Sequence, residues 1–144
     1  MTNSNSYQFI IRDTADAADE KLLFEGLNQH GHETKAMSPI QPFVILVKDK
    51  NGNTVGGAKG QTYYGCLYVD ILWIEKELRH LGLGTTLMSE AEKIGKEKKC
   101  TFATVNTMDW EALSFYQKLG YQIEFVRGGY VKESKMYFLR KSLE

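Results

Sequence analysis

The residues Arg79-His80-Leu81-Gly82-Leu83-Gly84 have the composition of a phosphate-binding turn. An apolar run at residues 67–74 precedes them and an amphipathic run at residues 83–98 follows, which predicts a strand and then a helix. The first-turn amides of a helix have no partner within the helix, and the helix dipole adds partial positive charge there. A strand, a turn with glycines and a helix N-terminus therefore predict a site for an anionic group.

The glycine spacing narrows the choice of ligand. A dinucleotide-binding fingerprint needs a third glycine at position 87, where this chain has Leu87, and no Gly-x-x-x-x-Gly-Lys-Ser/Thr run occurs. The pattern that does match is Arg/Gln-x-x-Gly-x-Gly, carried by Arg79, Gly82 and Gly84. Taken alone, it also fits a strand-to-helix turn that uses glycine only for tight packing.

A second segment, residues 109–121, has the pattern of a short helix with defined ends. Asp109 is a suitable N-cap residue and Gly120 a suitable residue just past the C-terminus. Four residues share one apolar face: Ala112, Phe115, Tyr116 and Leu119. The segment predicts a helix that presents Tyr116 toward the core.

In this order, the two segments resemble motifs A and B of the GCN5-related N-acetyltransferase (GNAT) family. Motif B is usually written Asn-x-x-Ala-x-x-Phe/Leu-Tyr-x-x-x-Gly-Phe/Tyr, and Asp109 stands where the family has Asn. An ionised Asp cannot donate the amide hydrogen bond that the family's Asn gives to pantetheine, so Asn106 is the alternative donor. The resemblance covers roughly residues 7–143.

The resemblance implies an α/β GNAT acyl-CoA acyltransferase fold, with a mixed, partly split seven-stranded sheet flanked by helices. It implies one N-acetyltransferase domain over residues 1–144, acetyl-CoA as co-substrate, no metal and an amine acceptor. The amides of residues 81–85 would hold the pyrophosphate, and the main chain of residues 72–74 would pair with pantetheine. The implied CoA-binding residues are Leu72, Trp73, Ile74, Arg79, His80, Leu81, Gly82, Leu83, Gly84, Thr85, Asn106, Asp109 and Tyr116.

Acetyl transfer to an amine also needs a polarised thioester carbonyl, a general acid and a general base. In the family a strand bulge aims an amide at the thioester oxygen, which favours Trp73 and Ile74 as donors. Tyr116 is the candidate acid for the leaving thiolate. Asp70 is the candidate base, because period-2 alternation places it on the same sheet face as Leu72 unless a bulge intervenes.

The N-terminal part of the chain offers alternatives for the base and little regular patterning. A strand is expected at residues 7–12, then a helix capped by Asp13-Thr14, then a loop with at most one short helix at residues 28–41. His30, His32 and Glu33 fall in this loop and are the alternatives to Asp70 for removing or binding the acceptor's proton. Their spacing fits no helical zinc motif.

The rest of the chain predicts a sheet. Asn51-Gly52 between the apolar runs 43–47 and 54–62 is a hairpin signal, and the glycines of the second run imply a bulge or a close backbone approach. Residues 66–75 continue an antiparallel meander, whereas residues 101–106 should pair in parallel with residues 67–74 across the helix. A final hairpin is expected from residues 121–126 and 134–143.

Composition excludes several other classes of protein. The 144 residues include 18 basic and 18 acidic side chains, so no net field favours nucleic acid or an anionic membrane. No apolar stretch reaches the ~20 residues that span a bilayer, and the polar start carries no secretory pattern, so a cytoplasmic location is expected. Cys66 and Cys100 are expected to be small buried residues.

These observations predict direct transfer of acetyl from acetyl-CoA to a primary amine of a small molecule or peptide within a ternary complex. The alternative is a non-catalytic sensor or scaffold module that keeps the fold and binds acyl-CoA. An enzyme using a longer acyl-CoA differs only in the pocket beyond the thioester. The resemblance to the family is also compatible with a homodimer. The sequence does not specify the acceptor.

Overall fold

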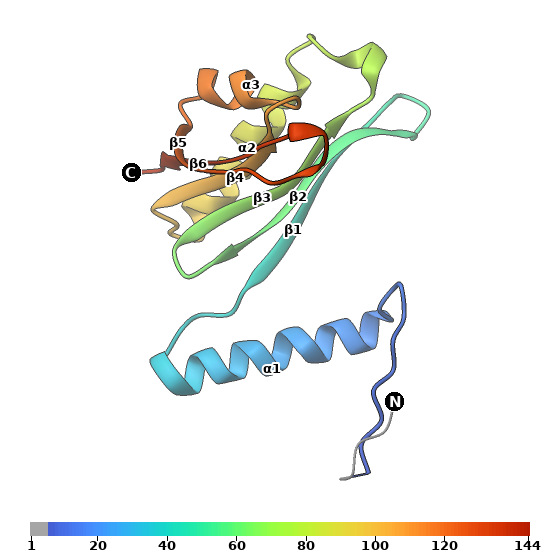
Figure 1. Ribbon diagram of the computed structural model, residues 1–144, viewed down its shortest axis with the longest axis vertical. Helices are drawn as coiled ribbons and strands as arrows, with labels where there is room; N and C mark the ends of the chain where they lie inside the picture. The colour runs from blue at the N-terminus through green and yellow to red at the C-terminus, as the bar shows by residue number, and fades with distance from the viewer. Residues whose placement is uncertain (1–5) are drawn as a thin grey trace. The chain divides into compact units, whose positions relative to one another are not determined.

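The computed structural model describes residues 6–144 and divides into two compact units, Met1–Pro39 and Ile40–Glu144 (Figure 1). Residues 1–5, which hold most of the polar start expected to lack a secretory pattern, lie outside the described part of the chain.

The N-terminal unit is dominated by one helix, α1 (Ala17–Lys35), that is longer than expected. The predicted loop at residues 28–41 is wrong for residues 28–35, because the helix continues through His30, His32 and Glu33, whereas residues 36–40 have no regular secondary structure. An (i, i+4) hydrogen bond from Gln29 Nε2 to Glu33 Oε1, 2.8 Å long, supports this last part of the helix. The helix ends where Ala36 takes a left-handed φ of 53°.

Two further expectations for this unit are corrected. The predicted strand at residues 7–12 does not form, since only an isolated bridge at Gln8 occurs there. The Asp13-Thr14 pair does not cap α1, whose N-cap residue is Asp16 without a side-chain hydrogen bond. A strand needs a neighbour to satisfy its backbone groups, and local composition does not supply that neighbour.

The C-terminal unit is a mixed sheet with strand order β1-β2-β3-β4-β6-β5 (Figure 1). Within the described residues it has six strands, one fewer than expected, because the strand at residues 7–12 is missing. The strands are β1 (Gln41–Lys48), β2 (Thr54–Tyr63), β3 (Cys66–Ile74), β4 (Phe102–Met108), β5 (Gln122–Arg127) and β6 (Met136–Ser142). The helices are η1 (Lys76–Leu78), α2 (Leu83–Glu97), α3 (Leu113–Lys118) and η2 (Val131–Glu133).

The predicted connections of this sheet are confirmed. β1 and β2 form an antiparallel hairpin around Asn51-Gly52, where Gly52 has a φ of 82°. β3 and β4, which precede and follow α2 in the sequence, pair in parallel, as a crossover connection requires. β6 lies between β4 and β5 and is antiparallel to both.

The core lies on the face of the sheet that α2 and α3 cover. Leu67 and Val69 of β3 contact Leu87 and Met88 of α2 within one buried cluster, to which α3 adds Tyr116. Cys66 and Cys100 are both buried, as expected. The opposite face of the sheet carries the alternate residues of each strand.

Candidate active site

The sheet splits between its two central parallel strands. β3 and β4 pair only from Cys66–Val69 with Phe102–Val105, although β3 continues to Ile74 and β4 to Met108. Beyond Val69 and Val105, the facing edges of the two strands therefore have no recorded strand partner in the described chain. Unpaired backbone groups on a strand edge can bind an extended ligand as an added strand.

A bulge interrupts β3 at the start of the split. Lys59 pairs with Ile71 and Gly60 pairs with Val69, so Asp70 has no partner on β2. Gly60 is required here because a Cβ would overlap the carbonyl oxygen of Tyr68. The glycines of β2 thus correctly predicted a close backbone approach.

The bulge determines on which face of the sheet the Asp70 side chain lies. After it, Leu72 packs against the helix-covered core, whereas Asp70 is exposed. The expectation that Asp70 shares a face with Leu72 is corrected, because the extra residue shifts the alternation by one. The bulge lies at Asp70 rather than at Trp73 and Ile74, which moves the candidate amide donors to this earlier part of the strand.

Asp70 belongs to a small polar cluster at the split. The Tyr68 hydroxyl donates to Asp70 Oδ1 at 3.5 Å, and Asn106 Nδ2 donates to the Tyr68 hydroxyl at 3.3 Å. The cluster links β3 to β4 where their backbone pairing stops. Burial and the nearby Asp70 carboxylate raise the pKa of Tyr68, so its phenol stays protonated and can donate to Asp70 at neutral pH.

Tyr116 of α3 is buried, with 6% of its surface exposed. Its ring packs edge-on against Phe115 and Tyr121, at centroid distances of 5.2 and 5.8 Å. Burial first, then the charge of Glu111 and the proximity of Tyr68, raise the pKa of Tyr116 to about 12. No buried polar side-chain atom of the described residues lacks a hydrogen-bond partner.

The predicted anion-binding turn leads from β3 through η1 into α2. Gly82 is the N-cap residue of α2 with a φ of 84°, and no side chain caps the helix. The first turn also holds no acidic residue, so its amides carry no competing negative group. Arg79 Nε donates to the Ile74 carbonyl at 3.0 Å, which ties the turn to the end of β3.

Gly84 has a packing role beside any role in anion binding. A Cβ at this position would lie 3.3 Å from Cζ of Phe115, closer than most side-chain contacts allow. The bare helix turn therefore makes room for the aromatic side chain of α3. His80 has a positive φ of 66° and Leu81 is 67% exposed, which places both in the exposed part of the turn.

The start of α3 differs from the sequence prediction. The helix begins at Leu113 after the N-cap residue Ala112, so Asp109 lies in a turn and does not cap it. Thr107 Oγ1 accepts from the Ala112 amide at 3.0 Å, and Glu111 Oε1 accepts from the Met108 amide at 2.9 Å. These two side chains satisfy the backbone in place of Asp109. The end of the helix is confirmed, with Gly120 at a φ of 97°.

Sequence reasoning missed Tyr68, Thr107 and Glu111. Tyr68 lies on the strand face opposite Leu67 and Val69, and the period-2 pattern alone could have placed it beside the split. Thr107 and Glu111 lie on either side of Asp109, and each is a residue type that commonly satisfies backbone amides near helix starts. Because Asp109 has the stronger N-cap preference, the sequence prediction chose it instead of Thr107 and Glu111.

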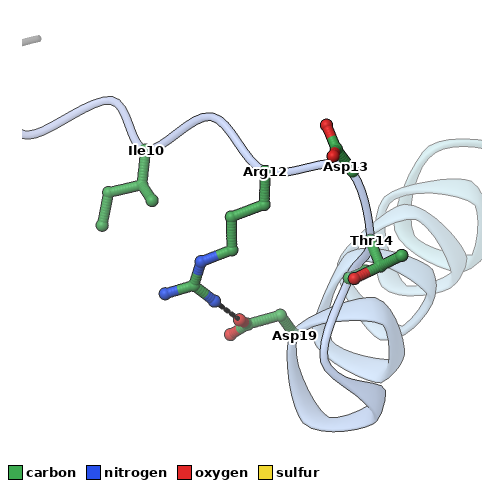
Figure 2. Close-up of a pocket in the computed structure, with 6 residues that line it drawn as sticks. Ile10, Arg12, Asp13, Thr14 and Asp19 are labelled. Atoms are coloured by element: carbon green, nitrogen blue, oxygen red, sulfur yellow. Dashed lines mark ion pairs between the residues drawn. The ribbon is translucent and has the colours of Figure 1, made fainter.

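A shallow pocket elsewhere in the chain does not qualify as the site. It lies in the N-terminal unit beside the start of α1, and Figure 2 shows Arg12 reaching toward Asp19. The Arg12 Nη1 to Asp19 Oδ2 distance is 3.8 Å, and more than half of each side chain is exposed. Such exposed pairs contribute little energy.

Residues 6–144 lack two further features. No three side chains of the types His, Cys, Asp or Glu come together as a metal site there. No helix in the same residues combines the length and apolar character needed to cross a bilayer.

Comparison with known proteins identifies the family. The sequence profile of the acetyltransferase (GNAT) family matches residues 11–121. An acetyltransferase of Agrobacterium fabrum is 28% identical over 113 residues, 78% of this chain and 82% of that protein. A blasticidin-S acetyltransferase of Streptomyces morookaense is 33% identical over 86 residues, 59% of this chain and 63% of that protein.

A crystal structure of an acetyltransferase from Agrobacterium tumefaciens superposes with a TM-score of 0.78. It is 26% identical, and the match covers 94% of this chain and 99% of that one. The split sheet, the uncapped start of α2 and the buried tyrosine of α3 thus agree with the sequence match. The chain belongs to the acetyltransferase (GNAT) family and is an acetyltransferase.

Proposed function

We propose that this acetyltransferase transfers the acetyl group of acetyl-CoA to a primary amine by direct attack in a ternary complex. The observation that carries the proposal is the split between β3 and β4, which begins after Val69 and has the Asp70 carboxylate, the base candidate, beside it. The acid candidate Tyr116 is buried in the cluster to which Val69 also belongs. These two side chains supply the carboxylate and the phenol that the transfer needs.

Two features of the structure suit the binding of acetyl-CoA. The first turn of α2 offers amides without a capping side chain or an acidic residue, which suits a pyrophosphate. The unpaired edge of residues 70–74 suits the amide groups of pantetheine. A streptothricin acetyltransferase from Bacillus anthracis with the same fold was solved in complex with acetyl coenzyme A.

The chemistry assigns one proton transfer to each side chain. An alkylammonium has a pKa near ~10.4, so Asp70 takes a proton from it, directly or through water, before the amine attacks the thioester carbon. The carbon–sulfur bond then breaks, and the Tyr116 hydroxyl protonates the leaving thiolate. The nitrogen, now bonded to the acetyl carbon, loses its remaining extra proton to solvent, from which the phenolate is reprotonated. Amides beside the bulge at Asp70 stabilise the oxyanion.

A covalent acyl-enzyme is less well supported. Both cysteines are buried, and burial raises the pKa of the Cys100 thiol, which disfavours the reactive thiolate. Cys66 Sγ lies 3.8 Å from Thr104 Oγ1, within the paired part of β3 and β4 rather than at the split.

The test is thiol release from acetyl-CoA in the presence of a panel of primary amines. We expect amine-dependent release of free CoA together with the acetylated amine in mass spectra. CoA binding without release by any amine would favour the non-catalytic sensor or scaffold. We further propose that residues 1–144 work as one domain, because the family match runs through both units. A homodimer and a cytoplasmic location stay predictions.

A further inference from the structure

The polar cluster at the split continues into a row of aromatic side chains on the face opposite α2. Directly paired residues share a sheet face, so Asn106 of β4 lies beside Phe138 of β6, and Phe138 beside Phe125 of β5. The rings of Phe138 and Phe125 are 5.7 Å apart between centroids. Since Asn106 donates to Tyr68, the row runs from Asp70 on β3 to the sheet edge at β5.

Arg127 lies on these two rings. Its Cζ atom is 4.8 Å from the Phe138 centroid and 5.9 Å from the Phe125 centroid. Its side chain is exposed, and no carboxylate of the described residues forms an ion pair with it. A cation–π contact does not require the N–H groups as hydrogen-bond donors to another side chain, so they are available to an anion.

A guanidinium held in this way is suited to one kind of ligand. Its planar N–H fork matches a carboxylate or a phosphate, each of which offers paired oxygens. Phe138 is paired with Asn106, on a strand about 4.8 Å away, and Asn106 itself hydrogen-bonds to Tyr68 beside Asp70. One extended molecule can therefore reach both the Asp70 end and the Arg127 end of the row.

We infer that Arg127 binds a carboxylate or phosphate group of the acceptor, so that the substrate is an amine that also carries an anionic group. The inference rests on the proposed acetyl transfer, because it takes the amine end of the acceptor to lie at Asp70. It separates this enzyme from one built for polyamines, whose further positive charges Arg127 would repel. Arg127 determines specificity and takes no part in proton transfer.

The experiment compares acceptors that differ only in the anionic group. Triglycine is compared with triglycinamide, and 6-aminohexyl phosphate with 6-aminohexanol, to distinguish a carboxylate from a phosphate. For each pair, kcat/KM is measured by thiol release, and binding by calorimetric titration in the presence of CoA. Wild type should prefer the anionic member of at least one pair by roughly 10- to 100-fold, as expected for a charge-assisted hydrogen bond.

Arg127→Gln should abolish this preference mainly through KM, with kcat kept, and Arg127→Lys should restore it in part. Arg140→Gln is the matched control, because Arg140 also stacks on a ring of this face, 3.9 Å from Phe102. Phe102 pairs with Cys66 at the end of β3 away from Asp70, so this variant should keep the preference.

The two proposals fail in different ways. Thiol release with no charge preference in either pair, or a preference that survives Arg127→Gln, would overturn the anionic subsite and leave acetyl transfer standing. Binding of an anionic probe that depends on Arg127, without thiol release, would support the subsite and count against turnover.

Discussion

At the scale of single residues, Tyr116 is the best-supported candidate for a chemical role. Its raised pKa, about 12, keeps the phenol protonated at any pH where the enzyme is expected to work. Tyr116→Phe retains the ring that packs against Phe115 and Tyr121, so CoA affinity should be kept. The rate should fall by roughly 10²-fold, the lower end of general acid catalysis.

Single-turnover rates and CoA titration separate these two effects. Tyr121→Phe is a suitable control, because the Tyr121 hydroxyl donates to Glu92 at 2.8 Å rather than standing at the split. An unchanged single-turnover rate in Tyr116→Phe would make Tyr116 a core aromatic residue only.

Asp70 is exposed at the bulge of β3, and its proposed role as the general base can be tested by substitution. Asp70→Asn preserves size and can still accept from the Tyr68 hydroxyl, but it cannot take a proton from the acceptor. Turnover should fall and the acidic limb of the pH–rate profile should flatten, with CoA binding kept. Glu33→Gln and His30→Gln, on α1, test the alternative bases in the same assay. A wild-type profile in Asp70→Asn would assign the base elsewhere.

At the scale of elements, the start of α2 is the part that should hold the pyrophosphate. Thr85 is exposed in the first turn, where a negative side chain is favourable for the helix itself. Thr85→Glu should therefore maintain or raise the melting temperature while repelling the phosphates and weakening CoA binding by at least about 10-fold, as for a charge-assisted hydrogen bond lost.

Ser89→Glu adds the same charge to an exposed position one turn later and should leave CoA affinity nearly unchanged. This pair of variants is cleaner than any substitution at Gly84, where a side chain would press on Phe115. Equal affinities in Thr85→Glu and Ser89→Glu would place the pyrophosphate away from this helix start.

The elements that the sequence predicted correctly are those with local causes. Asn51-Gly52 specifies its hairpin through turn geometry, and the apolar stripe of α2 requires a crossover between parallel strands. The glycines of β2 predicted a close approach between two backbones. That this approach occurs at Gly60 depends on the pairing of β2 with β3. The register of that pairing is a tertiary property, so Asp70 could not be oriented from the sequence.

The errors share a different cause. Tyr7 to Arg12 has strand composition, yet within the described residues it forms only an isolated bridge at Gln8. Residues 28–35 have weak periodicity yet continue α1, with a local hydrogen bond from Gln29 to Glu33. Asp109 has the best N-cap preference of its segment, but Thr107 and Glu111 take up the backbone amides first. The two rings under Arg127 come from the predicted final hairpin, but their link to Tyr68 and Asp70 runs through β4, and sequence spacing does not bring β3, β4 and β6 together.

At the scale of the whole molecule, buried tyrosines join the helices to the sheet. Tyr121 and Lys141 both bind Glu92, each at 2.8 Å, and so link β6 and the segment after α3 to α2. Glu92 and Lys141 are 13% and 29% exposed, which makes this the least exposed ion pair of the described residues. Removing one partner should therefore cost more than breaking the exposed Lys93–Glu90 pair.

These tyrosines predict how stability depends on alkaline pH. Burial raises the pKa of Tyr63 and of Tyr116 to about 12, and it raises those of Tyr68 and Tyr121 as well. Below pH 10 the phenols are protonated in both the folded and the unfolded chain, so their contribution to the free energy of unfolding is fully present. As pH rises through 10, the unfolded chain releases these protons while the folded chain retains them, so the free energy of unfolding falls until about pH 12.

Urea unfolding at pH 8, 10 and 11 measures this slope, and the Tyr116→Phe variant isolates one phenol. Other groups also titrate in this range, but they do so equally in the two proteins, so the difference between the slopes belongs to Tyr116. Wild type should lose more stability between pH 10 and 11 than Tyr116→Phe, by up to about 1.4 kcal/mol, the value of one pKa unit. Identical slopes would mean that Tyr116 titrates alike in the folded and unfolded chain, which would remove the argument that burial keeps it protonated for catalysis.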